Sequence, residues 1–324
     1  MNKKKETKMK ISIIVPIYNE EENINPLYTA VKNTMDKIEN DYELIYVNDG
    51  STDNTEQTIK EIAGKHSQSA QKGQIISLNM RKNFGQTAAM DAGIKHATGD
   101  IIITMDGDLQ NDPEDIPKLI QKIQQGSDIV VGWRYNRKDK ILKNLMSRTS
   151  WIIRRILLNE KIHDSGCSLK AYKKECFNGV DLYGEGHRYL HLTLALKGYK
   201  ITEIKVKHHP RKYGKTKYNY KRIIKGFLDL LTIWYFTKYS SRPMHFFGTI
   251  GIANFLLGII IGLYLVIGKI VQGWALADRP MLLLVVLLIV LGVMFLIFGI
   301  IGELIMRIYY KTHNENYYSL KEDK

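Results

Sequence analysis

Short apolar runs alternate with segments of helical spacing along the first 133 residues. Apolar side chains recur every three or four positions in segments such as 22–38, which predicts amphipathic helices. Short apolar runs that end in polar turns predict buried strands, here residues 11–18, 43–49, 74–79, 100–106 and 127–133. This alternation predicts an α/β domain whose mostly parallel sheet carries helices on both faces.

Two much longer apolar segments lie further along the chain. Residues 243–268 and 280–302 contain 26 and 23 residues without a formal charge. A helix of about 20 apolar residues spans the hydrocarbon core of a bilayer. A pair of buried core helices is the alternative, but core helices rarely run so long without a charged side chain. The two segments therefore predict a hairpin of transmembrane helices.

Two basic segments combine apolar positions with Lys and Arg. Residues 141–158 and 221–242 have the spacing and charge of helices that lie at the level of the lipid headgroups. An amphipathic helix of a soluble core is the alternative for each segment. The second segment carries aromatic side chains of the kind that anchor proteins at a membrane surface, namely Trp234, Tyr235, Phe236 and Tyr239.

Composition and charge narrow the class of protein. With 44% hydrophobic and 25% charged residues, the 324-residue chain is not disordered. Its two cysteines, Cys167 and Cys176, exclude a disulfide framework and a cysteine-built zinc site. The net charge of +14 comes from residues 133–242, which hold 26 Lys or Arg and 8 Asp or Glu. Such a basic block indicates an anionic partner: nucleic acid, an anionic membrane or a phosphorylated substrate.

Charged residues beside the apolar segments predict the orientation of the hairpin. Lys238 and Arg242 precede the first segment, and Arg307 and Lys311 follow the second. The positive-inside rule then places both termini in the cytoplasm, and no signal peptide is evident at the amino end. We expect a multi-pass protein of the inner (plasma) membrane. Its predicted parts are a cytoplasmic domain (1–220), an interfacial helix (221–242), two membrane helices (243–302) and a cytoplasmic tail (303–324).

Polar residues gather where the predicted strands end. They are found at residues 18–20, 48–49, 81–83 and 106–108. Because parallel strands end at the same edge of a sheet and ligands bind there, we expect these clusters to form one site. No strand is followed by the glycine-rich motif of a dinucleotide-binding fold or by a complete P-loop.

The cluster after the fourth predicted strand has the residue types of a metal site. Asp106, Asp108 and Gln110 place oxygen-bearing side chains at alternate positions, and Gly107 allows the backbone to approach a ligand. Carboxylate and amide oxygens suit Mg²⁺ or Mn²⁺, which bridge phosphates. A solvated turn with helix-capping aspartates is the alternative, but the apolar strand before Asp106 favours a ligand-binding role.

Several motifs in this order resemble those of family 2 glycosyltransferases, in particular the enzymes that transfer sugars to polyprenyl phosphates. The matching segments are 15–24 (VPIYNEEENI), 47–55 (VNDGSTDNT), 81–93 (RKNFGQTAAMDAG), 104–114 (TMDGDLQNDPE), 132–134 (GWR) and 211–218 (RKYGKTKY). The resemblance implies a GT-A-like (Rossmann-like) fold and an enzyme that uses a nucleotide-sugar donor. Two departures are Asn48-Asp49, where the family usually has two acidic residues, and Gly107, where it has alanine.

The resemblance also implies roles for particular residues. The nucleoside would lie against Pro16, Tyr18, Glu20, Val47 and Asp49, with Arg81 nearby. Asp106, Asp108 and Gln110 would hold the metal, beside Gly107. Arg134 would contact the transferring phosphates, with Arg148 as a further candidate. Arg211 and Lys217 would close over the diphosphate, and Asp164 matches a position viewed as a base.

The chemistry of such a reaction fits these residue types. A sugar leaves a nucleotide diphosphate, so cations must neutralise the charge that develops on the diphosphate. A phosphate-monoester acceptor has a second pKa of about 6 and is an anion at neutral pH. It needs placement more than a base, so Asp164 could equally be a structural hydrogen-bond acceptor.

We therefore expect metal-dependent, inverting transfer of a sugar, from a UDP-hexose donor, to undecaprenyl or another polyprenyl phosphate at the cytoplasmic face. A homo-oligomer is left open, and nucleic acid is not expected as a partner. Two alternatives remain. A polysaccharide synthase shares this domain but has a Q-x-x-R-W motif that is absent here. A membrane-tethered nucleotide- or nucleic-acid-binding module would have no need for carboxylates in a crevice.

Overall fold

The computed structural model divides the chain into two compact units, Met1–Leu230 and Leu231–Lys324. It describes residues 9–69, 71–135, 155, 162–182, 184, 186–211, 231–232, 234–236, 238–239, 242–275 and 280–313. The predicted helix at 141–158 therefore lies outside the described residues, apart from Arg155.

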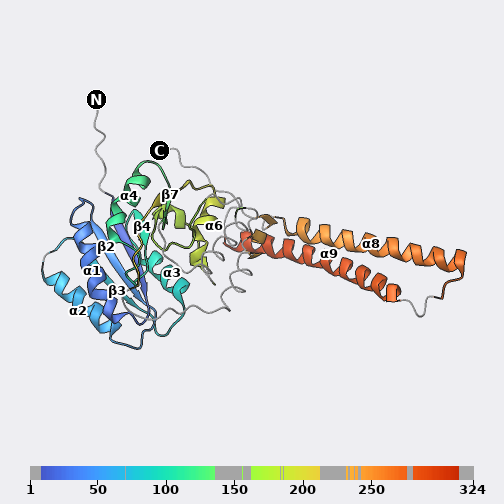
Figure 1. Cartoon of the computed structure of the whole chain (residues 1–324), viewed down its shortest axis with the longest axis horizontal. Helices are drawn as coiled ribbons and strands as arrows, with labels where there is room; N and C mark the ends of the chain where they lie inside the picture. Colours follow the sequence, from blue (N-terminus) through green and yellow to red (C-terminus); the bar gives the residue numbers. More distant parts are fainter. Residues whose placement is uncertain are drawn as a thin grey trace, which may run out of the picture. The chain divides into compact units, whose positions relative to one another are not determined.

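The first unit is built on one seven-stranded sheet (Figure 1) with the order β3-β2-β1-β4-β6-β5-β7. Only β6 runs antiparallel to its neighbours, β4 and β5. The GT-A-like, mostly parallel sheet predicted from the sequence is confirmed. The strands are β1 (Ile11–Ile17), β2 (Tyr42–Asn48), β3 (Gln74–Asn79), β4 (Ile101–Thr104), β5 (Ile129–Trp133), β6 (Lys170–Lys173) and β7 (Ile201–Lys205).

Helices pack on both faces of this sheet. Apolar side chains of α1, α2 and α4 form one core cluster with strand residues such as Ile13, and those of α3 and α6 form a second cluster with strand residues such as Ile14. Successive strand residues thus face opposite clusters, as a strand buried on both sides requires. The helices are α1 (Glu21–Met35), α2 (Thr55–Gln68), α3 (Gln86–His96), α4 (Ile116–Gln124) and α6 (Leu190–Leu196), with 3₁₀ turns η1 (Pro113–Asp115), η2 (Lys174–Phe177) and η3 (Gly186–Arg188).

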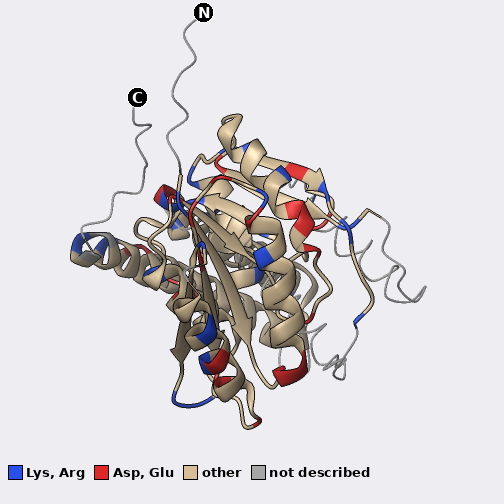
Figure 2. Ribbon diagram, turned by 90° about the vertical axis from the view of Figure 1, so that its left-hand side faces the viewer, with Lys and Arg blue, Asp and Glu red and all other residues tan. Residues whose placement is uncertain are grey.

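Charged side chains lie mostly outside these clusters. Figure 2 shows acidic and basic residues interspersed over the helices that cover the sheet. Glu43, at the start of β2, is an exception, because its side chain is only 1% exposed. Its carboxylate accepts hydrogen bonds from Ser12 Oγ (2.6 Å) and Thr98 N (2.6 Å) and pairs with Lys10 Nζ (2.8 Å). These contacts tie together the amino ends of neighbouring strands.

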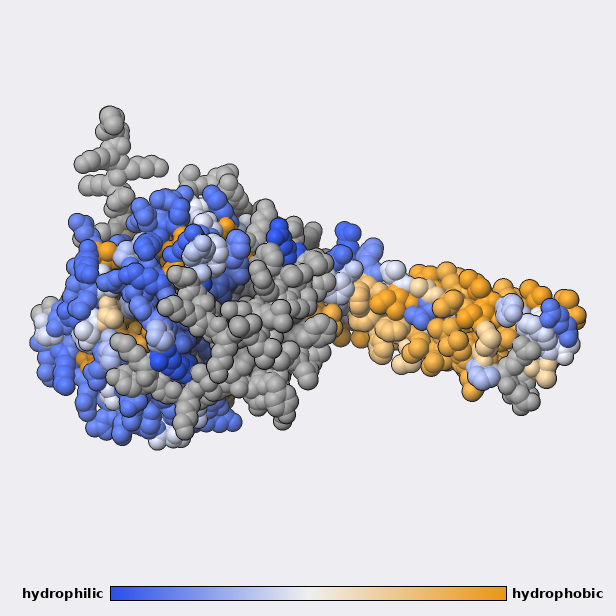
Figure 3. All heavy atoms as spheres, in the orientation of Figure 1, coloured by the Kyte–Doolittle hydropathy of each residue, from blue (hydrophilic) through white to orange (hydrophobic). Residues whose placement is uncertain are grey.

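The second unit contains two long helices, α8 (Pro243–Gln272) and α9 (Pro280–His313). They pack closely where two glycines meet: a Cβ added to Gly251 would lie 2.8 Å from the carbonyl oxygen of Gly292. Both helices are long and apolar enough to cross a membrane. Most of their apolar side chains are exposed, and Figure 3 shows a continuous hydrophobic surface along the pair.

The aromatic residues that precede α8 pack against its first turn. The described part of 231–239 is helical, and the rings of Tyr239 and Phe246 lie 5.0 Å apart, centroid to centroid. Trp234 contacts Phe246 at 5.8 Å. These aromatic side chains therefore form one cluster at one end of the helical pair.

Candidate functional site

The loops that follow β1 and β2 are joined by hydrogen bonds at one edge of the sheet. The backbone N–H of Asp49 donates to the carbonyl of Ile17 (2.8 Å), and that of Asn19 donates to Ser51 Oγ (2.9 Å). Asn19 has a left-handed backbone (φ 55°), which asparagine tolerates better than most residues. The polar clusters at residues 18–20 and 48–49 therefore lie together, as the strand pattern predicted.

Asp49 holds the loop that follows β3. Its carboxylate accepts hydrogen bonds from the backbone N–H groups of Phe84 (2.7 Å) and Gly85 (2.9 Å). Gly50 lies against the same loop, since a Cβ there would come within 2.3 Å of Lys82 C. Both oxygens of Asp49 thus position the 82–85 backbone. Arg81, which opens this loop, is exposed.

The other residues assigned to the nucleoside differ in exposure. Pro16 and Tyr18 are half-buried at the end of β1. Glu20 is also half-buried and accepts a hydrogen bond from Asn23 Nδ2. The side chain of Val47 is fully buried in the core with Ile14, so any contact from Val47 to a ligand would have to come from its backbone.

The carboxylates of Asp106 and Asp108 are held from different directions. Asp106 Oδ1 accepts a hydrogen bond from Gln86 Nε2 (2.8 Å), in the first turn of α3. Asp108 Oδ2 pairs with Arg211 Nη2 (2.6 Å). Burial raises the pKa of Asp106, and the neighbouring Asp108 carboxylate raises it further. The site therefore gathers negative charge that a bound cation would neutralise.

The backbone around these two carboxylates is not an extended strand, so the expected alternation does not hold. β4 ends at Thr104, and Leu109 has a left-handed backbone (φ 60°), which is rare for a non-glycine residue. Gly107 is a site of close packing, since an added Cβ would lie 3.2 Å from Ile17 Cγ1. Gly107 thus packs closely against β1, and its predicted role in bringing the backbone to a ligand stays a prediction.

Arg211 reaches Asp108 because the segment before it pairs with the loop after β4. His209 N donates to the carbonyl of Gln110 (2.9 Å), and Lys207 N donates to Asp115 Oδ2 (2.6 Å). The His209 ring also contacts Asp112 Oδ2 (3.0 Å). Asp112 and Asp115 are therefore structural. Lys217, predicted to act with Arg211, and Arg148 lie outside the described residues.

Arg134 and Asp164 form a bidentate ion pair. Arg134 Nε and Nη2 donate to Asp164 Oδ2 (2.6 Å) and Oδ1 (2.8 Å), and the side chains are only 12% and 15% exposed. Burial opposes the positive charge, but the Asp164 carboxylate outweighs it and raises the pKa of Arg134. Both oxygens of Asp164 orient the guanidinium, which favours the structural alternative for Asp164 over a role as base.

A divalent cation fits the residues at the end of β4. Among the described residues, no group of three His, Cys, Asp or Glu side chains could hold a metal. Asp106 and Asp108 supply two carboxylates, and Gln110 follows them. Mg²⁺ is commonly bound by one or two carboxylates together with substrate phosphates and water. The donor set therefore suits a cation that is shared with a diphosphate.

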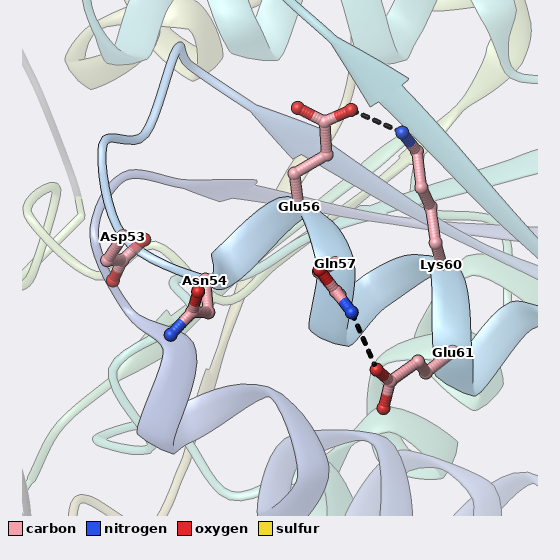
Figure 4. A pocket seen from close by; sticks show the side chains of 6 residues that line it. All are labelled: Asp53, Asn54, Glu56, Gln57, Lys60 and Glu61. Carbon is pink, nitrogen blue, oxygen red and sulfur yellow. Dashed lines mark hydrogen bonds and ion pairs between the residues drawn. The ribbon is translucent and has the colours of Figure 1, made fainter.

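Gln86 is a site residue that the sequence assignment omitted, although it lies inside the 81–93 motif. A long-range contact from α3 to Asp106 has no signal in periodicity or spacing. The structure also has a hollow at the start of α2 (Figure 4), lined by Asp53, Asn54, Glu56, Gln57, Lys60 and Glu61. It shares no residue with the predicted site, and Glu56 and Lys60 pair with each other there.

Comparisons with known proteins agree on the type of enzyme. The sequence profile described as Glycosyl transferase family 2 matches residues 12–180. A dodecaprenyl-phosphate galacturonate synthase of Rhizobium johnstonii is 39% identical over 321 residues, 97% of this chain and 93% of that protein. An undecaprenyl-phosphate 4-deoxy-4-formamido-L-arabinose transferase of Proteus mirabilis is 31% identical over 93% of this chain and 89% of that protein.

Solved structures share the fold at low sequence identity. Glucosyl-3-phosphoglycerate synthase from Mycobacterium tuberculosis, solved with Mn²⁺ and UDP-glucose, has a TM-score of 0.52 and 18% identity over 70% of this chain and 79% of that one. A mannosyltransferase from Pyrobaculum calidifontis, solved with GDP-mannose and Mn²⁺, has a TM-score of 0.50 and 17% identity over 71% of this chain and 64% of that one.

Proposed function

We propose that this chain, a glycosyltransferase that belongs to glycosyl transferase family 2, transfers a sugar from a nucleotide-sugar donor to a polyprenyl phosphate. The single observation that most strongly supports a polyprenyl-phosphate acceptor is the similarity of almost the whole chain to relatives that are named for such acceptors. The relatives named for dodecaprenyl-phosphate and undecaprenyl-phosphate substrates match 97% and 93% of it, well beyond the catalytic domain. The donor in this proposal is a UDP-activated sugar.

The reaction is a displacement at the anomeric carbon. An oxygen of the acceptor phosphate forms the new bond to C1 of the sugar. The bond from C1 to the donor diphosphate breaks, and its electrons leave with the nucleoside diphosphate. A single displacement inverts the configuration at C1. The acceptor is already an anion at neutral pH, so the step needs no proton transfer from the attacking oxygen.

Arg211 supplies positive charge where the diphosphate would leave. Its guanidinium lies 2.6 Å from the Asp108 carboxylate, and in this proposal it turns from that carboxylate to a phosphate of the donor. Arg134, held rigidly by Asp164, presents a second fixed cation for the phosphates. The Arg134 charge, fixed in advance, would stabilise the departing diphosphate without reorganisation during the reaction.

Asp106 and Asp108 would hold Mg²⁺ or Mn²⁺, with Gln110 as a further oxygen ligand. When bound, such a cation neutralises charge that develops on the diphosphate. Gln86 keeps Asp106 in place through a neutral amide, which adds no positive charge to compete with the cation. The remaining predicted residues, from Pro16 to Asp49, would line the nucleoside end of the crevice.

The second unit would anchor the enzyme where its acceptor lies. The exposed apolar side chains of α8 and α9 suit contact with lipid, and the aromatic cluster before α8 suits the membrane interface. In this proposal the catalytic domain and both termini are cytoplasmic, as the flanking Lys and Arg residues indicate. The boundaries of the membrane segments would then fall within Pro243–Gln272 and Pro280–His313.

Release of nucleoside diphosphate by the detergent-purified protein tests the proposal. The assay covers a panel of UDP- and GDP-sugars with Mg²⁺ or Mn²⁺, with and without undecaprenyl phosphate. We expect release from at least one donor only when both lipid and metal are present. Release that is independent of lipid would indicate hydrolysis or another acceptor. No release from any donor by folded protein would contradict the proposal.

A further inference from the structure

We propose that Glu203, in β7, is a positioning residue for Arg134 and acts on it through Asp164. This inference rests on the proposed function, in which Arg134 contacts the transferring phosphates. The sequence motifs do not include Glu203, which lies 39 residues from Asp164 along the chain. Its side chain is only 11% exposed, although β7 is the last strand in the order of the sheet. A carboxylate that is shielded to this extent needs hydrogen-bond partners.

Glu203 holds two consecutive residues, His163 and Asp164. Its Oε1 accepts hydrogen bonds from the backbone N–H groups of His163 (3.0 Å) and Asp164 (3.1 Å). Since an ionised carboxylate can only accept, His163 Nδ1 donates to Glu203 Oε2 (2.7 Å). Three hydrogen bonds to one carboxylate therefore fix the backbone from which the Asp164 side chain extends.

The Asp164 carboxylate in turn sets the position of Arg134. Its Oδ2 accepts hydrogen bonds from Arg134 N (3.2 Å) and Nε (2.6 Å), and its Oδ1 accepts from Nη2 (2.8 Å). Because the guanidinium is planar, contacts at both Nε and Nη2 set its orientation as well as its place. A shift of the Asp164 backbone would therefore move or release the guanidinium of Arg134.

A ring stack joins the same segments beside the ion pair. The His163 imidazole stacks on the Trp133 indole, with 4.5 Å between the ring centroids and 15° between the planes. Trp133 and Arg134 are consecutive at the end of β5, as His163 and Asp164 are in their segment. β7 pairs in parallel with β5 as far as Trp133, which brings Glu203 to both backbone N–H groups. Three segments thus meet at the Arg134 ion pair.

Asp128 is the matched control, a carboxylate with similar contacts at the other end of the same two strands. Its Oδ2 accepts a hydrogen bond from the backbone N–H of Lys200 (2.9 Å), and its Oδ1 pairs with Lys173 Nζ (2.5 Å). Its side chain is 22% exposed. Asp128 precedes β5 and Arg134 follows it, so the two residues lie at opposite ends of that strand. Substitution of Asp128 therefore measures a role in stability alone.

Chemical modification of Arg134 tests the proposal without turnover. Phenylglyoxal reacts with accessible guanidinium groups, and mass spectrometry of the digested full-length protein measures the reaction at Arg134. We expect the rate to rise at least about fivefold in Glu203→Leu, because the held segment can then open locally, and to stay at the wild-type value in Asp128→Leu. Glu203→Gln should stay within about twofold of wild type, because its amide oxygen still accepts both backbone N–H groups.

Kinetics of lipid-dependent nucleoside-diphosphate release test whether this positioning serves transfer. We expect kcat/KM to fall about tenfold in Glu203→Leu, the loss expected for one hydrogen bond to a charged group. In an Asp164→Ala background the same substitution should change kcat/KM by less than about twofold, because the carboxylate through which Glu203 acts is already missing. Asp128→Leu should leave kcat/KM unchanged. Glu203→Val, with a side chain that suits a strand, replaces Glu203→Leu if circular dichroism shows that the latter is unfolded.

Two results would overturn the assignment. One is a modification rate at Arg134 that is no higher in Glu203→Leu than in Asp128→Leu. The other is an equal loss of kcat/KM from Glu203→Leu in the wild-type and Asp164→Ala backgrounds, which would make Glu203 a general structural residue. Failure of the proposed function is distinguishable, because wild-type protein would then show no lipid-dependent release, whereas the modification experiment would still report on Arg134.

Discussion

Single residues in this site are held by partners from distant parts of the chain. Asp106 is oriented by Gln86, Asp108 by Arg211, and Arg134 by Asp164. Each partner differs in charge: a neutral amide, a cation that can move to a phosphate, and a carboxylate that fixes a cation. The positions of the two acidic side chains are thus set by neighbours that lie outside their own loop.

Asp164→Asn separates the two roles considered for this residue. The substitution removes one charge from a pair that is mostly buried, so we expect Arg134 to be less well fixed and kcat/KM to fall about 10- to 100-fold. If Asp164 only orients Arg134, the shape of the pH–rate profile should not change. The assay is lipid-dependent nucleoside-diphosphate release between pH 5.5 and 9.

A base at position 164 would give a different outcome. Its loss would lower kcat by about 10²- to 10⁴-fold and remove the acidic limb of the profile. Asp36→Asn serves as the control, because Asp36 makes a comparable but more exposed pair with Lys32 on α1 (2.7 Å). It should leave the activity unchanged.

At the scale of elements, the apolar strands of the sheet could be predicted and the polar ones could not. Residues 74–79 form β3 as predicted. The predicted strand 11–18 ends one residue later than β1, and the predicted strand 43–49 is shifted by one residue from β2. β6 has the sequence KAYK, which is only four residues long and contains no apolar run. It is a strand because β4 and β5 pair with it on both sides. Tertiary pairing of this kind leaves no local signal.

Glu43, at the amino end of β2, makes a pH-dependent contribution to the stability of the fold. Burial would raise its pKa, but hydrogen bonds from Lys10, Ser12 and Thr98 outweigh this effect and lower the pKa to about 2 from 4.5. Because the folded-state pKa is depressed, the stabilisation is complete above about pH 4.5 and is lost as the pH falls towards 2. It amounts to about 3 kcal/mol.

Glu43→Gln should therefore destabilise the first unit by about 3 kcal/mol near pH 7, with a difference from wild type that shrinks below about pH 4.5. Thermal unfolding followed by circular dichroism across this range measures it. Glu56→Gln is the control, since Glu56 is 47% exposed in its pair with Lys60 and should cost less than about 0.5 kcal/mol. A difference that stays constant down to pH 3 would contradict the assigned pKa.

At the scale of the whole molecule, the family and the residues of the candidate site could be predicted from the sequence. The contacts between those residues could not. The motifs at 47–55 and 104–114 are local, so they predicted the carboxylates, and the family resemblance is confirmed. Val47 shows what a motif alone does not reveal: it lies in the 47–55 motif, but its side chain is buried in the sheet. Gln86 and Glu203 acquire their neighbours only through folding, across 20 and 39 residues of sequence.

Transfer of labelled sugar into lipid is the decisive measurement, because it requires a nucleotide-sugar site and a lipid acceptor in one enzyme. Vesicles that contain undecaprenyl phosphate and the full chain are incubated with the radiolabelled donor and Mn²⁺, and the organic phase is counted. We expect label in a polyprenyl-phosphate sugar with wild-type protein and at least about a 100-fold loss in Asp108→Asn. Labelled polymer instead of lipid, or equal transfer by Asp108→Asn, would contradict it.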